Sequence, residues 1–272
     1  MSVPLRLLCI SVLCLFVACR GSKPQQKEIA RTVAPLTVGF YNVENLFDTK
    51  DNPDKIDEDF TPEGKYKWTE DVYAKKRANI AKAIASMGPN GPDLLGLAEV
   101  ENARVVQDLL ETEPLKGRNY AFLHAETPDM RGIDNAFVYD ADKFKEVSLE
   151  AVEVDFPEEP DYTSRKILVV SGKWNGHPLH IMVNHWPSRW GGAEASEPRR
   201  FRAATVAREA IDRLLQANPE ADIILMGDLN DDPFDRSVTE VIRAQQSAAK
   251  LAQDALFNAT YALHNPDDSG TL

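Results

Sequence analysis

Polar side chains that can bind a metal ion or a phosphate group follow short apolar runs at four places in this chain. Asn42 and Glu99 each end one such run, His185 ends a third, and Asp228 and Asn230 lie at the end of a fourth. A buried strand that emerges at the rim of a sheet delivers its last side chain to a cleft shared with its neighbours. We therefore expect these five side chains to form one metal and phosphate site.

The residue types suit that chemistry. The carboxylate of Glu99 is a hard oxygen ligand of the kind that Mg²⁺, Mn²⁺ or Ca²⁺ takes. Asp228 and Asn230 are alternate residues of an expected strand, so both would point to one face and could address one phosphate. Taken singly, a strand-terminal Glu is more often a solvated acid or a helix cap, and a lone Asn such as Asn42 is more often a turn former.

Alternating apolar runs and amphipathic segments indicate the elements that position these residues. The Asn175–Gly176 pair predicts a tight hairpin turn, and the polar stretch 48–68 is long enough to be either functional or disordered. Strands interleaved with helices and a hairpin predict an α/β fold, a four-layer α/β/β/α sandwich of two mixed sheets with the helices outside. The expected strands are 36–43, 94–100, 134–139, 166–174, 178–186 and 222–230, and the expected helices begin at Thr69, near Val105 and at Arg199.

Five local sequences carry a family resemblance. They are FYNVENLFD at 40–48, LAEVEN at 97–102, RGIDNAFVYD at 131–140, NHWPSR at 184–189 and GDLNDDP at 227–233. In order and in local sequence they resemble the endonuclease/exonuclease/phosphatase family, the deoxyribonuclease-I-like phosphoesterases, over residues 36–272. The resemblance implies hydrolysis of a phosphodiester (nuclease-like) or phosphomonoester bond by metal-assisted, in-line attack of water.

The resemblance also implies a role for each matching residue. Glu99 would be the principal metal ligand, with Asn42 coordinating directly or through water. Asp228 would orient the attacking water, while Asn230 and His185 would bind the phosphate, His185 as an imidazolium that stabilises charge on the transition-state oxygens.

Further phosphate contacts are expected from basic and amide side chains near the same motifs. Arginine suits phosphate because its planar guanidinium makes bidentate contacts. The alternative for the three arginines that open the expected helix is that they form its solvated face. The candidates are Asn135, Arg165, Arg189, Arg199 and Arg202, and the helix-opening arginines are Arg199, Arg200 and Arg202.

The chain is acidic, with a formal net charge of −12 over 272 residues. Acidity opposes non-specific binding to polyanions, although a bound divalent cation neutralises carboxylates locally. A nuclease would need a basic or aromatic groove beside the site, whereas a phosphatase would need only the arginines near the motifs. The acidic net charge favours a small or single-stranded substrate. No obligate protein partner is expected. The candidate groove residues are Lys65, Lys67, Trp68, Trp186 and Trp190.

The N-terminus has the pattern of an export signal. The apolar run 7–18 is too short to span a bilayer, and Ala18 before Cys19 resembles a bacterial lipobox. We expect a signal peptide at 1–19, lipid on Cys19, a flexible tether at 20–35 and the domain at 36–272, held on a bacterial membrane in the periplasm or at the cell surface. Ordinary cleavage without lipid is the alternative. All three cysteines lie in the signal segment, so no disulfide is expected in the domain.

The family's closing strand normally carries an Asp-His pair that activates water, and no Asp-His dipeptide occurs in this chain. After Asn230 the only histidine is His264, in a turn context. We therefore expect the domain to be incomplete at its C-terminal end, which would remove general-base assistance. The alternative function is a non-catalytic remnant that at most binds metal or phosphate.

Overall fold

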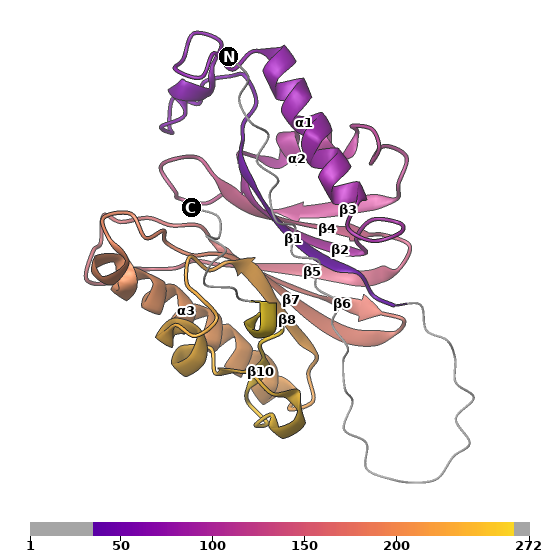
Figure 1. Ribbon diagram of the computed structural model, residues 1–272, viewed down its shortest axis with the longest axis vertical. Helices are drawn as coiled ribbons and strands as arrows, with labels where there is room; N and C mark the ends of the chain where they lie inside the picture. Colours follow the sequence, from indigo (N-terminus) through magenta and orange to yellow (C-terminus); the bar gives the residue numbers. More distant parts are fainter. Residues whose placement is uncertain (1–34, 264–272) are drawn as a thin grey trace.

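The computed structural model describes residues 35–263, in which two four-stranded sheets pack face to face. Helices α1 and α2 cover the outer face of the first sheet and α3 covers the outer face of the second (Figure 1). The predicted four-layer α/β/β/α fold is confirmed. Cys19, the signal segment, the tether up to residue 34 and His264 lie outside the described residues, so the predictions about them stay predictions.

The first sheet has the order β1-β2-β4-β3, with β1 and β2 parallel and the other pairs antiparallel. Its outer face buries the apolar stripe of α1, which includes Tyr73, Ile80 and Ile84. Asn102 begins α2 by accepting a hydrogen bond from the Val105 amide at 3.0 Å, which satisfies a free N–H of the first turn. The elements are β1 Val38–Leu46, α1 Glu70–Ala85, β2 Leu94–Val100, α2 Ala103–Leu110, β3 Tyr120–His124 and β4 Asp134–Asp140.

The second sheet has the order β5-β6-β7-β8, with only β7 and β8 parallel. The hairpin between β6 and β7 turns at Asn175 and Gly176, whose φ angles of 51° and 83° match the positive values that such a turn requires. The elements are β5 Phe144–Val152, β6 Ile167–Trp174, β7 His177–His185, α3 Ala193–Ala217 and β8 Ile223–Asp228. Within the described residues, β8 is followed by short pieces that include a π-helical turn Ser237–Val241, β9 Ala244–Gln245 and β10 Leu256–Phe257.

In the core between the two sheets, β2 lies very close to β7 and β8. A Cβ atom at Gly96 would lie 2.8 Å from the sulfur of Met226 and 3.1 Å from a methyl group of Val183. Phe137 and Ile181 fill the same layer and are fully buried. This contact brings the ends of strands from both sheets to one edge of the molecule.

The structure differs from the sequence prediction at four elements. Strand β5 was not expected because its sequence carries alternating charges on an exposed edge, and β3 was missed because its residues are only partly buried. Helix α3 begins at Ala193 rather than Arg199, and Pro198, which reads as a helix breaker, lies inside it. Strand β8 ends at Asp228, two residues earlier than expected.

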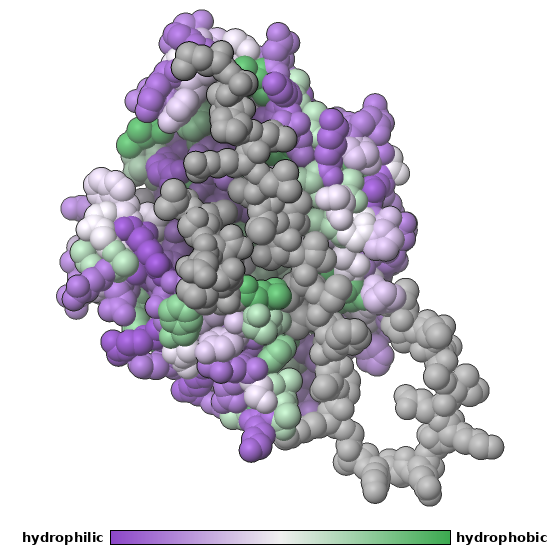
Figure 2. Space-filling model, in the orientation of Figure 1, coloured by the Kyte–Doolittle hydropathy of each residue, from purple (hydrophilic) through white to green (hydrophobic). Residues whose placement is uncertain are grey.

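On the face drawn in Figure 2, hydrophilic side chains make up most of the surface that the grey atoms leave uncovered. Within residues 35–263, no helix is both long and apolar enough to cross a bilayer.

Strand β7 also contains a histidine whose titration should affect stability. Burial lowers the pKa of His180, partly offset by Asp222, and its Nδ1 lies 2.8 Å from the Ser171 hydroxyl. At acid pH the unfolded chain therefore binds more protons than the folded one. The free energy of unfolding is highest above the unfolded pKa of about 6.5, where His180 is neutral in both states, and it falls as the pH drops below that value. Urea unfolding at about pH 7.5 and 5.5 should show a smaller acid loss of stability in His180→Gln than in the wild type.

Candidate active site

The ends of four strands, two from each sheet, meet at one point. Asn42 Nδ2 donates hydrogen bonds to Glu99 Oε1 at 3.2 Å and to Asp228 Oδ2 at 3.0 Å. His185 pairs with Asp228 across β7 and β8, and its Nε2 lies 3.8 Å from Glu99 Oε1. The structure thus brings together four of the residues that the sequence predicted to share a site, from positions up to 186 residues apart.

Backbone irregularities aim the two residues of the first sheet. Glu99 has a φ of 64°, and the register of β2 shifts between Ala98 and Val100, which turns the Glu99 side chain out of the regular alternation. Strand β1 shifts register after Asn42, and the Glu44 amide donates to Asn42 Oδ1 at 2.9 Å. A left-handed backbone at a non-glycine residue is costly, so its presence at Glu99 fits a functional position.

The donor set of this site fits a hard cation. The carboxylates of Glu99 and Asp228 converge on one neutral amide, that of Asn42. Among the residues that the structure describes, His185 is the one basic side chain within 4.0 Å of the Glu99 carboxylate. Two carboxylates and an amide are ligands that Mg²⁺, Mn²⁺ or Ca²⁺ accepts, and a bound cation would offset their mutual repulsion.

The surroundings of His185 oppose the charged form that the family resemblance implies, and its role as an imidazolium stays a prediction. Burial lowers its pKa well below the usual value, and the charges of Arg165 and Arg131 lower the pKa further. Its Nδ1 is buried and has no hydrogen-bond partner. The sequence did not indicate that burial and two arginines would oppose the charged form of this ring.

Asn230 reaches the site by a different route from the one expected. Because β8 ends at Asp228, Asn230 lies in a bend with a φ of 51° and not on the strand. Its backbone N–H donates to Asp228 Oδ1 at 3.1 Å, and its Nδ2 donates to the Trp186 carbonyl at 2.9 Å. A turn, rather than strand alternation, therefore positions Asn230 next to Asp228.

Two further buried residues that the sequence placed near the site, Asn135 and Arg165, have unpartnered polar atoms. Asn135 Nδ2 donates to the Lys166 carbonyl at 2.9 Å, while its Oδ1 has no partner. Arg165 donates from Nη1 to Asp129 at 3.1 Å and from Nη2 to the Trp186 carbonyl, which leaves its Nε without an acceptor. Buried polar groups are normally satisfied, so these atoms indicate places where a ligand or water would bind.

The arginines expected to contact phosphate are placed differently from one another. Arg189 Nε donates to the Asn230 carbonyl at 2.8 Å, so its guanidinium lies beside the GDLN turn. Arg199 pairs with Glu159 and stacks on Tyr162 at 4.0 Å. Arg202 pairs with Asp155. The contacts of Arg199 and Arg202 lead to the segment before β6 and not to the Glu99–Asp228 cluster, and their binding of phosphate stays a prediction.

Arg200 contradicts the interpretation that the helix-opening arginines form a solvated face. Its side chain is 2% exposed and pairs with Asp231, which is 4% exposed. It also donates to Ser196 Oγ and to the Ala193 carbonyl, each at 2.7 Å. Arg200 therefore ties the start of α3 to the turn that follows Asp228. The aromatic candidates Trp68 and Trp186 were likewise wrong as stacking surfaces, because both rings are buried.

A second group of possible metal ligands was missed. His124, Glu126 and Asp134 offer ligand atoms that all lie within 4.8 Å of one another. Asp134 is already engaged, since it lies 2.8 Å from His124 Nε2 and accepts from the Thr127 amide at 3.0 Å. The sequence signal was weak, because His124 ends a strand that was itself not predicted.

Comparison with known proteins settles the family. The profile of the Endonuclease/Exonuclease/phosphatase family matches residues 37–272. The chain belongs to this family. Membership places it among phosphoester hydrolases, a class that generally uses divalent metals, in agreement with the carboxylate cluster. A search of curated proteins finds no match.

Two solved structures with TM-scores above 0.5 share the fold at low identity, and a third is similar at a lower score. A mannosyl-6-phosphatase from Bacteroides thetaiotaomicron is 18% identical with a TM-score of 0.52, the alignment covering 76% of this chain and 70% of that one. An endonuclease/exonuclease/phosphatase family protein from the same organism is 20% identical with a TM-score of 0.51, over 75% and 66%. Humanized D. rerio TDP2 is 18% identical with a TM-score of 0.49, over 76% and 66%. The chain thus spans about two thirds of the length of these proteins.

Proposed function

We propose that this protein is a divalent-metal-dependent phosphoesterase that hydrolyses its substrate by in-line attack of water. The observation that carries the proposal is the convergence of Glu99 and Asp228 on the Asn42 amide, from both sheets. Glu99 and Asn42 would hold Mg²⁺ or Mn²⁺, with Ca²⁺ as a third candidate. A cation there would polarise the phosphoryl group and acidify a bound water.

The chain's own residues supply orientation on the other side of the site. Asp228 Oδ1 and Oδ2 each accept one hydrogen bond, from the Asn230 amide and from Asn42, so the carboxylate is fixed and retains lone pairs for the attacking water. The free edge of His185 and the Nε–H of Arg165 offer polar atoms to phosphate oxygens. Such preorganised groups contribute most where charge develops in the transition state.

Hydrolysis assays on the full chain, purified in detergent, test this function. The substrates are p-nitrophenyl phosphate, bis(p-nitrophenyl) phosphate, and single- and double-stranded DNA, each with EDTA, Mg²⁺ or Mn²⁺. We expect turnover that EDTA removes and Mg²⁺ or Mn²⁺ restores, with the preferred substrate separating phosphatase from nuclease. A folded protein that binds Mn²⁺ without any turnover would contradict the proposal and favour the non-catalytic remnant.

We further propose that the protein is exported and anchored to a bacterial membrane through lipid on Cys19. The support is the apolar run 7–18 followed by Ala18 and Cys19. In a bacterial host fed radiolabelled palmitate, the wild type should carry label and sediment with membranes. Cys19→Ala should lose the label. Equal labelling of both proteins would exclude Cys19 as the lipidated residue.

A further inference from the structure

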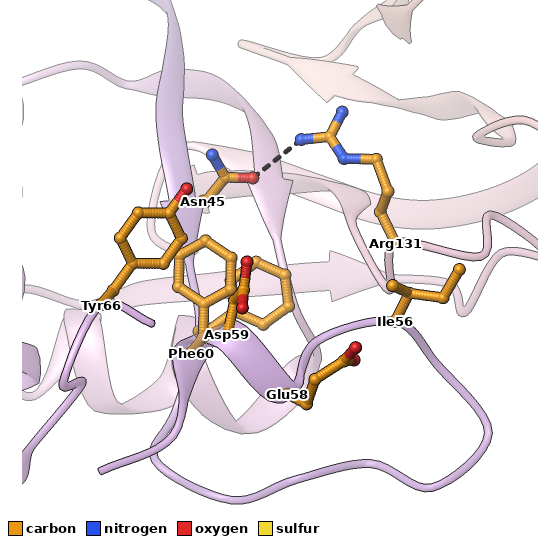
Figure 3. Close-up of a pocket in the computed structure, with 8 residues that line it drawn as sticks. Asn45, Ile56, Glu58, Asp59, Phe60, Tyr66 and Arg131 are labelled. Carbon is orange, nitrogen blue, oxygen red and sulfur yellow. Dashed lines mark hydrogen bonds between the residues drawn. The ribbon is translucent and has the colours of Figure 1, made fainter. Parts of the chain in front are cut away.

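We propose that a pocket beside the metal site binds one unpaired nucleobase of the substrate, next to the phosphate that is cleaved. This inference rests on the proposed phosphoesterase function and specifies its substrate class as a nucleotide or single strand. The pocket has a volume of about 240 Å³ and lies between the 48–68 segment and the loop before β4 (Figure 3). Sites for drug-sized ligands occupy roughly 300–1,000 Å³, so this one suits a single ring system.

Aromatic rings form a rigid wall of the pocket. Phe60 stacks on Phe47 with ring centroids 4.2 Å apart, and Tyr66 packs against Phe60 at 5.0 Å. Trp68 closes the group at 5.5 Å from Phe60, and its Nε1 donates to the Phe47 carbonyl at 2.9 Å. The long polar segment is therefore ordered by an aromatic cluster.

Tyr66 is the part of that cluster offered to a ligand. Phe47 and Trp68 are buried, whereas Tyr66 is 50% exposed and lines the pocket. An exposed ring supported from behind needs little reordering to stack on a flat partner, and base–aromatic stacking contributes about 1–3 kcal/mol. Ile56, 61% exposed, adds an apolar surface across the pocket.

The backbone of β1 connects the pocket to the metal site. Three residues after Asn42, Asn45 lines the pocket, because φ angles of 56° and 64° at Glu44 and Asn45 kink the strand. Asn45 Oδ1 accepts from Arg131 Nη2 at 2.9 Å, the dashed line in Figure 3. Arg131 therefore ties the loop before β4 to this kink in β1.

The charges of the lining select among ligands. Glu58 and Asp59 line the pocket and would repel a second phosphate, while their oxygens can accept from the exocyclic amino group of adenine, cytosine or guanine. Stacking and edge contacts both require a base that is out of a duplex. The formal net charge of −12 likewise disfavours a duplex, whose backbone is neutralised by basic surfaces.

The test compares two substrates that differ only in the bases. One is the dinucleotide dApdA, and the other has a tetrahydrofuran residue in place of each nucleoside. We expect the wild type to prefer dApdA, and Tyr66→Ala to lower kcat/KM on dApdA about 5- to 150-fold, the equivalent of one stacked base, with little effect on the abasic substrate. Tyr66→Phe should retain the preference. Phe257→Ala, which removes another exposed ring, should change neither rate.

Calorimetric titration of adenosine 5′-monophosphate into the full chain with Mn²⁺ requires no turnover. Binding weakened by Tyr66→Ala in a protein that hydrolyses nothing would support the pocket and contradict the phosphoesterase. Hydrolysis with equal rates on both dinucleotides would support the phosphoesterase and overturn the base pocket. Tighter binding of mannose 6-phosphate than of the nucleotide would also overturn it, in favour of a sugar ring on Tyr66.

Discussion

Glu99→Gln is expected to lower metal-dependent hydrolysis by about a thousandfold or more, since charge stabilisation by a cation amounts to several kcal/mol. The substitution keeps the size of the side chain and its hydrogen-bonding oxygen but removes the charge that holds the cation. Because Glu99 and Asp228 both approach the Asn42 amide, removing one carboxylate should not destabilise the metal-free protein. The measurements are kcat/KM and the rise in melting temperature on adding Mn²⁺, which should be present in the wild type and absent in the variant.

Glu126→Gln is the matched control for that experiment. Glu126 belongs to the second group of possible ligands, with His124 and Asp134, and is exposed. The Glu126→Gln variant should have a rate of hydrolysis and an Mn²⁺-dependent rise in melting temperature close to those of the wild type. A melting shift lost in Glu126→Gln and kept in Glu99→Gln would place the metal at the second group and contradict the assignment of Glu99.

Asp231→Ala is expected to cost about 3–5 kcal/mol of the free energy of unfolding, because it leaves the buried guanidinium of Arg200 without its anionic partner. Urea unfolding measures this loss. Asp232→Ala provides the comparison, since Asp232 pairs with Arg189 at 3.0 Å and the two side chains are about 40% exposed. An exposed pair contributes less than about 1 kcal/mol.

The double variant Arg200→Met with Asp231→Ala should recover part of that stability, because neither charge then remains buried. Equal losses of the free energy of unfolding in Asp231→Ala and Asp232→Ala would show that the burial of the ion pair does not determine how much its removal destabilises the protein. Full stability in Asp231→Ala would mean that Ser196 and the Ala193 carbonyl alone satisfy Arg200.

The strands that carry the site were predictable because each contains an apolar run followed by a polar residue. This pattern identified Asn42, Glu99, His185 and Asp228, and the structure joins all four. Local sequence could not show how a strand departs from regular geometry. The left-handed backbone of Glu99 depends on long-range pairing with β4.

Burial set by distant contacts explains most of the remaining differences. Arg200 follows Arg199 in sequence and has the same side chain, yet Arg200 is buried and Arg199 lies on a half-exposed face. The pKa of His185 is lowered first by burial and then by the charges of Arg165 and Arg131, and these surroundings exist only in the folded chain. The 48–68 segment is ordered because Phe60 stacks on Phe47, which directly follows β1. Composition alone does not show this contact, so the sequence could not decide whether the segment is functional or disordered.

The two sheets are contiguous halves of the chain, residues 38–140 and 144–228, and each contributes two of the four site residues. The first half holds the proposed metal ligands Asn42 and Glu99, whereas Asp228 and His185, proposed to orient water and phosphate, come from the second half. The proposed hydrolysis would therefore require the two halves to stay docked. A chain cleaved in the turn between β4 and β5 would keep every site residue. It should nevertheless hydrolyse substrate only while its two fragments remain associated. Activity should for the same reason vanish as soon as the sheets separate, even where each retains its strands.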